Sequence, residues 1–163
     1  MKWKTIGIIV LLFLIAIQFF HSPKNISANP SPDNIATRYP LPEGVDTILK
    51  KACYDCHSNN TVYPWYNNIQ PVAWWLHNHI DDGKRHLNFD VFTSYSIARQ
   101  YKKLDDIIDE IKQGDMPLPS YTIEHKDAIL TASEKEIIYD WCNALRDSIQ
   151  LKYPADSLVM KKK

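Results

Sequence analysis

A long apolar block lies near the start of the chain, TIGIIVLLFLIAIQFF at positions 5–20, in which only Thr5 and Gln18 are clearly polar. The block has no charged residue, and Lys2 and Lys4 precede it. As a helix, residues 3–20 reach about 27 Å at ~1.5 Å per residue, just short of a ~30 Å hydrocarbon core. A positive end followed by an apolar run is typical of an export segment, because the positive end stays in the cytoplasm. We therefore expect residues 1–21 to be a signal anchor, that is, a transmembrane helix, or a signal peptide.

Two alternatives to an uncleaved anchor follow from the same block. A cleaved signal peptide would use Ala28 as its best cleavage site, although Ile26 stands where a small residue is usual. A buried core helix is the weaker alternative, because a soluble helix does not need apolar residues on every face. The anchor and the cleaved peptide both direct the rest of the chain out of the cytoplasm.

Proline content and helical periodicity divide the rest of the chain into a linker and a series of helices. Residues 22–43 are rich in proline, which denies the backbone regular hydrogen bonds and predicts an extended linker. Apolar residues recur at helical spacing over residues 45–57, 71–83 and 95–113. The inward stripe of the second segment is expected to include Val72, Trp75 and His79.

A fourth helix is expected to begin at Thr131 or Ser133, because each has a glutamate three residues later. Its inward face is expected to include Ile137. No long run alternates apolar and polar residues, so the prediction is an all-α domain over residues 44–153, followed by a basic tail over residues 154–163.

The strongest chemical signal is Cys53-Tyr54-Asp55-Cys56-His57, a C-x-x-C-H sequence. Two thiols on one helical turn can add to the two vinyl groups of a haem, and the next residue can ligate the iron. This pattern predicts one covalent haem c per chain.

A redox disulfide would need a β-α-β pattern that the sequence lacks. A zinc site would need two further ligands, for which His77 and His79 are candidates. A static disulfide is the last alternative.

The segment 53–141 resembles the haem-binding domain family of bacterial c-type cytochromes. The resemblance rests on residues 53–89, which contain C-x-x-C-H, YPWY and WWL-x-x-H, on GDMPLPSY at 114–121, and on LTASEKEIIYDW at 130–141. It implies a small, cytochrome c-like, all-α domain around a single haem, in an exported or membrane-tethered protein.

Three residues are candidates for the sixth iron ligand. Met116 lies in a Met-Pro loop after the third predicted helix, which resembles the loop that supplies the distal thioether in small cytochromes c. His79 and His125 are the alternatives, whereas His77 and His86 are interpreted as surface residues. The haem pocket is expected to draw on seven aromatic side chains: Tyr63, Trp65, Tyr66, Trp74, Trp75, Tyr121 and Trp141.

Charge and residue types limit the function. The 19 basic and 19 acidic residues balance, which excludes the basic footprint of a nucleic-acid-binding protein. No paired carboxylates or nucleophile-base pair indicates an enzyme. The expected function is electron transfer with redox protein partners, in the bacterial cell envelope, with the N-terminal helix in the inner membrane and the haem on the periplasmic side. The alternative is a haem-based sensor or peroxidase-like domain with an open sixth coordination position.

Overall fold

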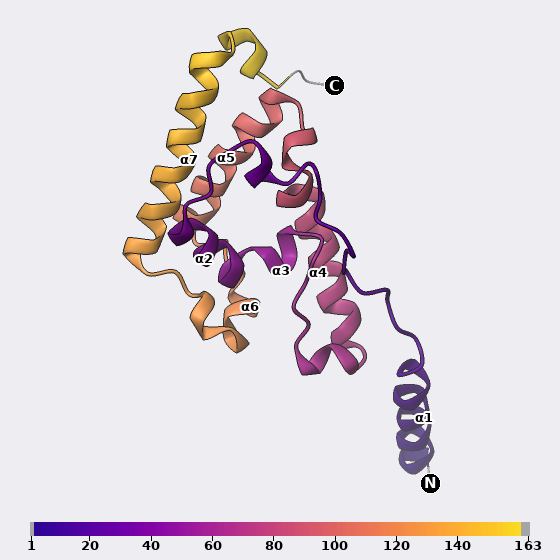
Figure 1. Cartoon of the computed structure of the whole chain (residues 1–163). Coiled ribbons are helices and arrows are strands. Elements are labelled where there is room, and N and C mark those ends of the chain that lie inside the picture. Colours follow the sequence, from indigo (N-terminus) through magenta and orange to yellow (C-terminus); the bar gives the residue numbers. More distant parts are fainter. Residues whose placement is uncertain (1, 161–163) are drawn as a thin grey trace.

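Seven α-helices and no β-strand make up the regular structure of residues 2–160, which are the residues that the computed structural model describes. The all-α prediction is confirmed, and Figure 1 shows the arrangement. The helices are α1 (Lys2–Ile17), α2 (Glu43–Ala52), α3 (Tyr54–His57), α4 (Val72–His86), α5 (Ile97–Gln113), α6 (Pro119–Glu124) and α7 (Ala132–Lys152). Short 3₁₀ turns cover Ile35–Thr37, Trp65–Asn68, Phe89–Ser94, Lys126–Ala128 and Ala155–Leu158.

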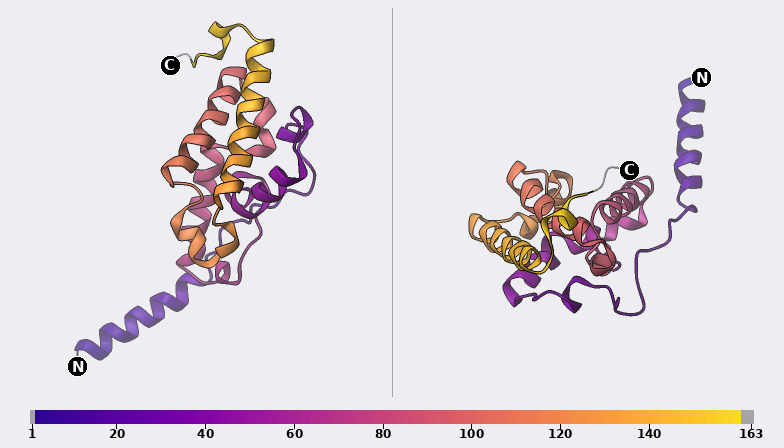
Figure 2. Two further views of the ribbon diagram at one scale, coloured as in Figure 1. Left: turned by 90° about the vertical axis from the view of Figure 1, so that its left-hand side faces the viewer. Right: turned by 90° about the horizontal axis from the view of Figure 1, so that it is seen from above.

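The two longest helices, α5 and α7, lie side by side and form the main core (Figures 1 and 2). Leu104 and Ile108 of α5 and Ile138 and Leu145 of α7 are buried in one apolar cluster. Local sequence explains the ends of α5, because the Ser96 side chain accepts a hydrogen bond from the Arg99 N–H and Gly114 adopts a left-handed φ of 82°.

The start of α7 shows which of the two expected caps is used. Thr131 and Glu134 form a capping box, in which the Thr131 hydroxyl accepts from the Glu134 N–H and the Glu134 carboxylate accepts from the Thr131 N–H. Helix α7 therefore begins after Thr131 and not after Ser133.

Three details of the expected helices are wrong. The helix expected over 45–57 is interrupted at Cys53, whose φ and ψ are −130° and −45°. Helix α4 continues past Gly83 to His86 and buries Ala73, Leu76 and Ile80, which leaves Val72 and Trp75 exposed. Ile137 is also exposed, because the buried stripe of α7 runs instead through Ile138 and Trp141. The neighbouring helices determine which stripe of α4 and of α7 is buried. Helical periodicity alone does not show where those neighbours lie.

Helix α1 is shorter than the expected transmembrane helix. It has 16 residues and ends at Ile17, so it reaches only about 24 Å at ~1.5 Å per residue. Its length is limited because Gln18 leaves the helical path and hydrogen-bonds to Gln70, at the entrance to α4. Among residues 2–160 no helix combines the length and the apolar character needed to cross a membrane, which corrects the expected span.

The proline-rich segment before α2 is extended, but it packs on the helical body. Ile35 and Tyr39 are buried, and the Tyr39 hydroxyl donates to Gln100 Oε1 at 2.6 Å. Ile26 pairs with Asn60 in an isolated antiparallel bridge. The segment therefore forms part of the folded unit, although it has the predicted irregular backbone. Residues 161–163 of the expected basic tail lie outside the described range.

Candidate haem site

The C-x-x-C-H sequence forms one tight turn between α2 and α4. The backbone N–H groups of Cys56 and His57 both donate to Cys53 O, at 3.2 and 2.9 Å. Asp55 connects this turn to the loop that follows it, because its Oδ1 accepts a hydrogen bond from the Val62 N–H at 2.9 Å. The break at Cys53 thus lets α3 present both cysteines and His57 from a single turn.

The His57 ring is oriented by two backbone carbonyls of α4 and its C-cap. Its Nδ1 lies 3.0 Å from Gly83 O and 2.9 Å from Leu87 O. Carbonyl oxygens only accept hydrogen bonds, so Nδ1 carries the proton and Nε2 is the free, basic nitrogen. Burial lowers the pKa of His57, and the two carbonyl contacts partly oppose that shift. A neutral imidazole with an anchored Nδ1 is the form that ligates a metal.

Helix α4 can approach this turn because residue 83 has no side chain. A Cβ atom built on Gly83 would lie 2.7 Å from Cys56 O, well inside contact distance. The close approach brings Gly83 O within hydrogen-bonding distance of His57.

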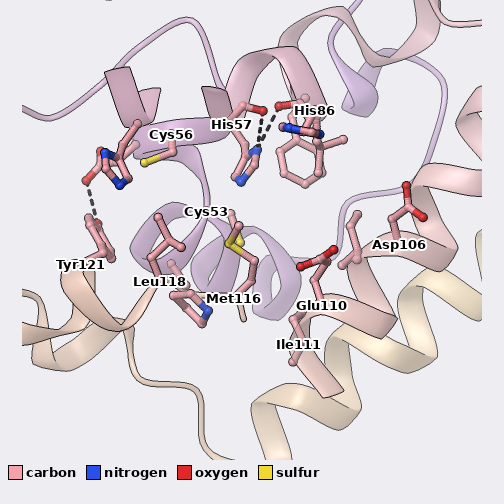
Figure 3. Close-up of a pocket in the computed structure, with 18 of the residues that line it drawn as sticks. Cys53, Cys56, His57, His86, Asp106, Glu110, Ile111, Met116, Leu118 and Tyr121 are labelled. Carbon is pink, nitrogen blue, oxygen red and sulfur yellow. Dashed lines mark hydrogen bonds between the residues drawn. The ribbon is translucent and has the colours of Figure 1, made fainter. Parts of the chain in front are cut away.

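A cavity of about 490 Å³ opens beside the turn, and its size is within the ~300–1,000 Å³ usual for small-molecule sites. Cys53, Cys56 and His57 all line it (Figure 3). Helices α4 and α5 and the loop around Met116 complete the wall. Apolar side chains such as Leu87, Ile107, Ile111, Leu118 and Leu130 dominate the interior, and Lys103, Asp106 and Glu110 stand among the polar lining residues.

Met116 reaches this cavity on a loop that is fixed to the end of α5. The backbone N–H groups of Asp115 and Met116 both donate to Glu110 O, at 3.0 and 3.2 Å. The left-handed Gly114 makes this reversal possible. In Figure 3 the His57 ring lies above the cavity, and Met116, with Leu118 and Ile111 on either side, lies below it. The structure thus brings together all four residues that the sequence predicted as cofactor-binding.

A comparison with protein families agrees with this geometry. The family model described as a haem-binding domain matches residues 12–144, which is most of the chain. The chain belongs to the haem-binding domain family. No curated protein and no solved structure matches it. The resemblance predicted from C-x-x-C-H, YPWY and the Met-Pro loop is confirmed, and the cavity has the residues that suit a haem.

The other histidines of the haem-binding domain separate into two groups. His79 lines the same cavity, with Nδ1 2.8 Å from Trp75 O and its ring against the Trp75 ring. His86 also lines the cavity, although the sequence suggested only a surface position. His125 lies elsewhere: its ring stacks on Tyr121 at 4.2 Å, and its Nε2 contacts the Tyr66 hydroxyl at 3.3 Å. The structure therefore removes His125 from the cavity, whereas His79 and His86 both belong to its wall.

The two thiols of the haem-binding domain are neutral and unpaired. Burial raises the pKa of Cys53 to about 12 and that of Cys56 to about 11. A reactive disulfide motif needs a lowered thiol pKa, so that alternative does not fit this environment. Within residues 2–160 no group of three or more His, Cys, Asp or Glu side chains is arranged to hold a metal ion.

One interaction at the site was not anticipated from the sequence. The Tyr121 hydroxyl donates to Asp55 Oδ2 at 2.8 Å, which ties α6 to the C-x-x-C-H turn. Burial, reinforced by this carboxylate, raises the pKa of Tyr121. Asp55 occupies a variable position between the two cysteines, so nothing in the motif indicated a structural role.

The aromatic residues contribute less to the cavity than expected. Among the described residues, Tyr121 is the only one of the seven expected aromatic side chains that lines it. Trp141 packs in the core between α7 and the proline-rich segment and donates from Nε1 to Pro40 O at 2.9 Å. Trp65 and Trp75 are exposed.

Proposed function

We propose that this haem-binding domain is a monohaem c-type cytochrome that transfers single electrons. Cys53 and Cys56 would hold the haem through two thioethers, with His57 and Met116 as axial ligands. The supporting observation is that Cys53, Cys56, His57 and Met116 all line one cavity, while His57 Nδ1 donates to backbone carbonyls and leaves Nε2 free of them. Haem bound there supplies a one-electron couple at iron.

The residues around the cavity favour the reduced state. A thioether is a softer and weaker base than imidazole, so Met116 ligation raises the reduction potential relative to a second histidine. The apolar wall formed by residues such as Ile107, Ile111 and Leu118 excludes water, and this disfavours the additional positive charge of ferric iron. An iron with two protein ligands leaves no position for a substrate, which fits an electron carrier better than an enzyme.

The proposed location is the bacterial cell envelope, with the haem-binding domain on the periplasmic side. Covalent attachment of haem to C-x-x-C-H takes place outside the bacterial cytoplasm, and the segment formed by Lys2, Lys4 and residues 5–20 is typical of exported proteins. The partners are proposed to be redox proteins that exchange electrons at the open side of the cavity.

The test is to produce the full chain in a host that matures c-type cytochromes and to measure its mass and absorption spectrum. We expect the mass of one haem to be added, and we expect carbon monoxide to leave the spectrum of the reduced protein unchanged. A bare polypeptide mass contradicts the covalent haem. A prompt spectral shift with carbon monoxide contradicts two-ligand iron and supports the sensor or peroxidase-like alternative.

Two matched variants identify the sixth ligand. Met116→Ala should keep the haem attached, bind carbon monoxide when reduced, and lose the sulfur-to-ferric-iron charge-transfer band. His79→Ala, which changes another residue of the cavity wall, should leave both properties unchanged. The reverse pattern assigns the iron to His79. The double variant Cys53→Ala/Cys56→Ala should lose the haem during denaturing chromatography.

A further inference from the structure

Two stretches of this chain contain no charged residue. Residues 5–23 carry no Asp, Glu, Lys or Arg, and neither do residues 56–80, in a chain that is 23% charged overall. The first stretch contains most of α1, and the second contains the loop with YPWY and the first half of α4. Absence of charge over 25 successive residues (56–80) is unusual for the surface of a protein surrounded by water.

Hydrogen bonds join these two stretches at the end of α1. Gln18 Oε1 accepts from the Gln70 N–H at 2.9 Å, and Gln18 Nε2 donates to Gln70 O at 3.2 Å. Phe20 O accepts from Gln70 Nε2 at 2.7 Å and from Trp74 Nε1 at 3.1 Å. Gln70 is buried, so these bonds lie in a packed joint. The position of α1 relative to α4 is therefore defined and does not depend on the proline-rich segment.

Five large apolar side chains between residues 62 and 75, the stretch that contains Gln70, are exposed. We call them the apolar end, defined as Val62, Trp65, Ile69, Val72 and Trp75. Val62 is 78% exposed and Trp65 is 74% exposed. In Figures 1 and 2, α1 projects beyond the end of α4 that carries this surface. The apolar end and α1 thus face in the same general direction from the molecule.

We propose that the apolar end is a lipid-docking surface, on which the haem-binding domain rests while α1 enters the hydrocarbon layer. Exposed tryptophans next to an apolar helix suit the boundary between headgroups and acyl chains, where one part of the ring is apolar and the N–H remains hydrated. Contact of this kind does not require a helix that crosses the bilayer.

Lipid fits these surfaces better than a protein partner does. Helix α1 exposes apolar side chains on all sides, from Ile6 to Ile15, whereas a helix that binds a protein groove buries one stripe. The stretch that contains the apolar end has no charged residue, so no ion pair there could fix the orientation of a protein partner. Lys2 and Lys4, in the first turn of α1, are the only charged residues of that helix.

The docked orientation would hold the cavity near the membrane surface. Trp75 belongs to the apolar end, and Gly83, eight positions later on the same helix, lines the cavity. Eight residues of α-helix cover about 12 Å at ~1.5 Å per residue. The inference is independent of which residues ligate the haem.

The test uses the full holoprotein with vesicles of phosphatidylethanolamine and phosphatidylglycerol and a carbene photolabel that partitions into the bilayer. We expect labelling within residues 5–20 and at Trp65, Val72 and Trp75. Leu151, in the last turn of α7, is 89% exposed and provides the matched apolar control, which should stay unlabelled.

Each other outcome overturns the proposal. Label confined to residues 5–20 shows that the apolar end does not dock, and label in neither stretch shows that lipid is not the partner. A doubled mass in lipid-free solution, with the apolar end protected from a water-soluble label, identifies a second copy of the chain instead. Haem mass and absorption are recorded on the same samples, so a failure of haem attachment is distinguished from a failure of docking.

A variant separates docking of the apolar end from insertion of α1. Val62→Ser/Trp65→Ser removes two highly exposed side chains, and we expect labelling at Trp75 to fall by about fivefold while labelling of residues 5–20 persists. Leu151→Ser is the matched control and should change neither. Equal labelling of Trp75 in both variants overturns the role of Val62 and Trp65.

Discussion

Gly83 is the single residue on which the proximal side of the site most depends. Cys56 O occupies the space that a side chain at residue 83 would need. The carbonyl oxygen of Gly83 accepts a hydrogen bond from the protonated Nδ1 of His57. One glycine in α4 therefore sets both the distance between two helices and the orientation of the proposed iron ligand. Its φ is not in the left-handed region, so the requirement is one of space and not of backbone conformation.

Gly83→Ala is expected to lower the free energy of unfolding by about 1–3 kcal/mol, because a methyl group cannot fit without moving α4 away from the turn. The same movement should weaken the His57 contacts and change the absorption and electron paramagnetic resonance spectra of the ferric haem. Urea unfolding and these spectra measure the two effects.

Gly44→Ala is the control for that variant, since a Cβ at Gly44 meets nothing within 4 Å. It should leave the haem spectra unchanged and stabilise α2 by up to ~1 kcal/mol. Similar spectra for both alanine variants would contradict the positioning role of Gly83.

At the scale of elements, Glu134 connects the start of α7 to α2. Its carboxylate accepts from the Thr131 N–H at 2.9 Å and from Lys51 Nζ at 2.6 Å. These contacts, the Lys51 hydrogen bond foremost, hold the pKa of Glu134 below its ordinary value. The residue therefore both caps a helix and bridges two helices beside the cavity.

A lowered folded-state pKa has a definite consequence for stability against pH. The stabilisation by Glu134 is fully present above the pKa it has in the unfolded chain and is lost as the pH falls through its lower pKa in the folded protein. Glu134→Gln keeps an amide oxygen for the cap but removes the charge, so stability at neutral pH should fall by about 1 kcal/mol. Its unfolding free energy should also vary less with pH through the acid range than that of the unmodified protein.

Chemical denaturation at a series of pH values measures this difference. Glu136→Gln, on an exposed position of the same helix, serves as the control and should follow the unmodified protein. Parallel pH curves for Glu134→Gln and the unmodified protein would exclude the proposed ion pair as a source of acid sensitivity.

For the molecule as a whole, the cavity is part of the fold and not a surface feature. Segments from α2, α4, α5 and the Met116 loop each contribute to its wall. Filling a space of about 490 Å³ with an apolar ring supplies the contacts that these walls otherwise lack.

We therefore expect the chain produced without haem to unfold at lower urea concentration than the holoprotein, with a difference of at least ~3 kcal/mol, the cost of emptying the space of one large buried side chain. The comparison needs the same sequence expressed in hosts with and without cytochrome maturation. Identical midpoints would mean that the cavity is not filled by the attached haem.

Features determined by neighbours in sequence could be predicted. Helical periodicity, Gly114 and the Thr131 cap placed both ends of α5 and the start of α7 to within about two residues, because each depends on contacts within one or two helical turns. The spacing of Cys53, Cys56 and His57 defined the candidate attachment site for the same reason. Helix α1 was expected to continue to residue 20 but ends at Ile17, next to Gln18, which hydrogen-bonds to Gln70 more than fifty positions away.

The sequence by itself determined that this is an all-α protein with a C-x-x-C-H turn and a methionine loop, since period, capping and local spacing act over a few residues. Only the tertiary structure decided which carbonyls orient His57, that His79 and His86 reach the cavity while His125 does not, and that Trp65 and Trp75 face outward. Each of these depends on how helices pack across long stretches of chain, where one residue of rotation exchanges a buried face for an exposed one.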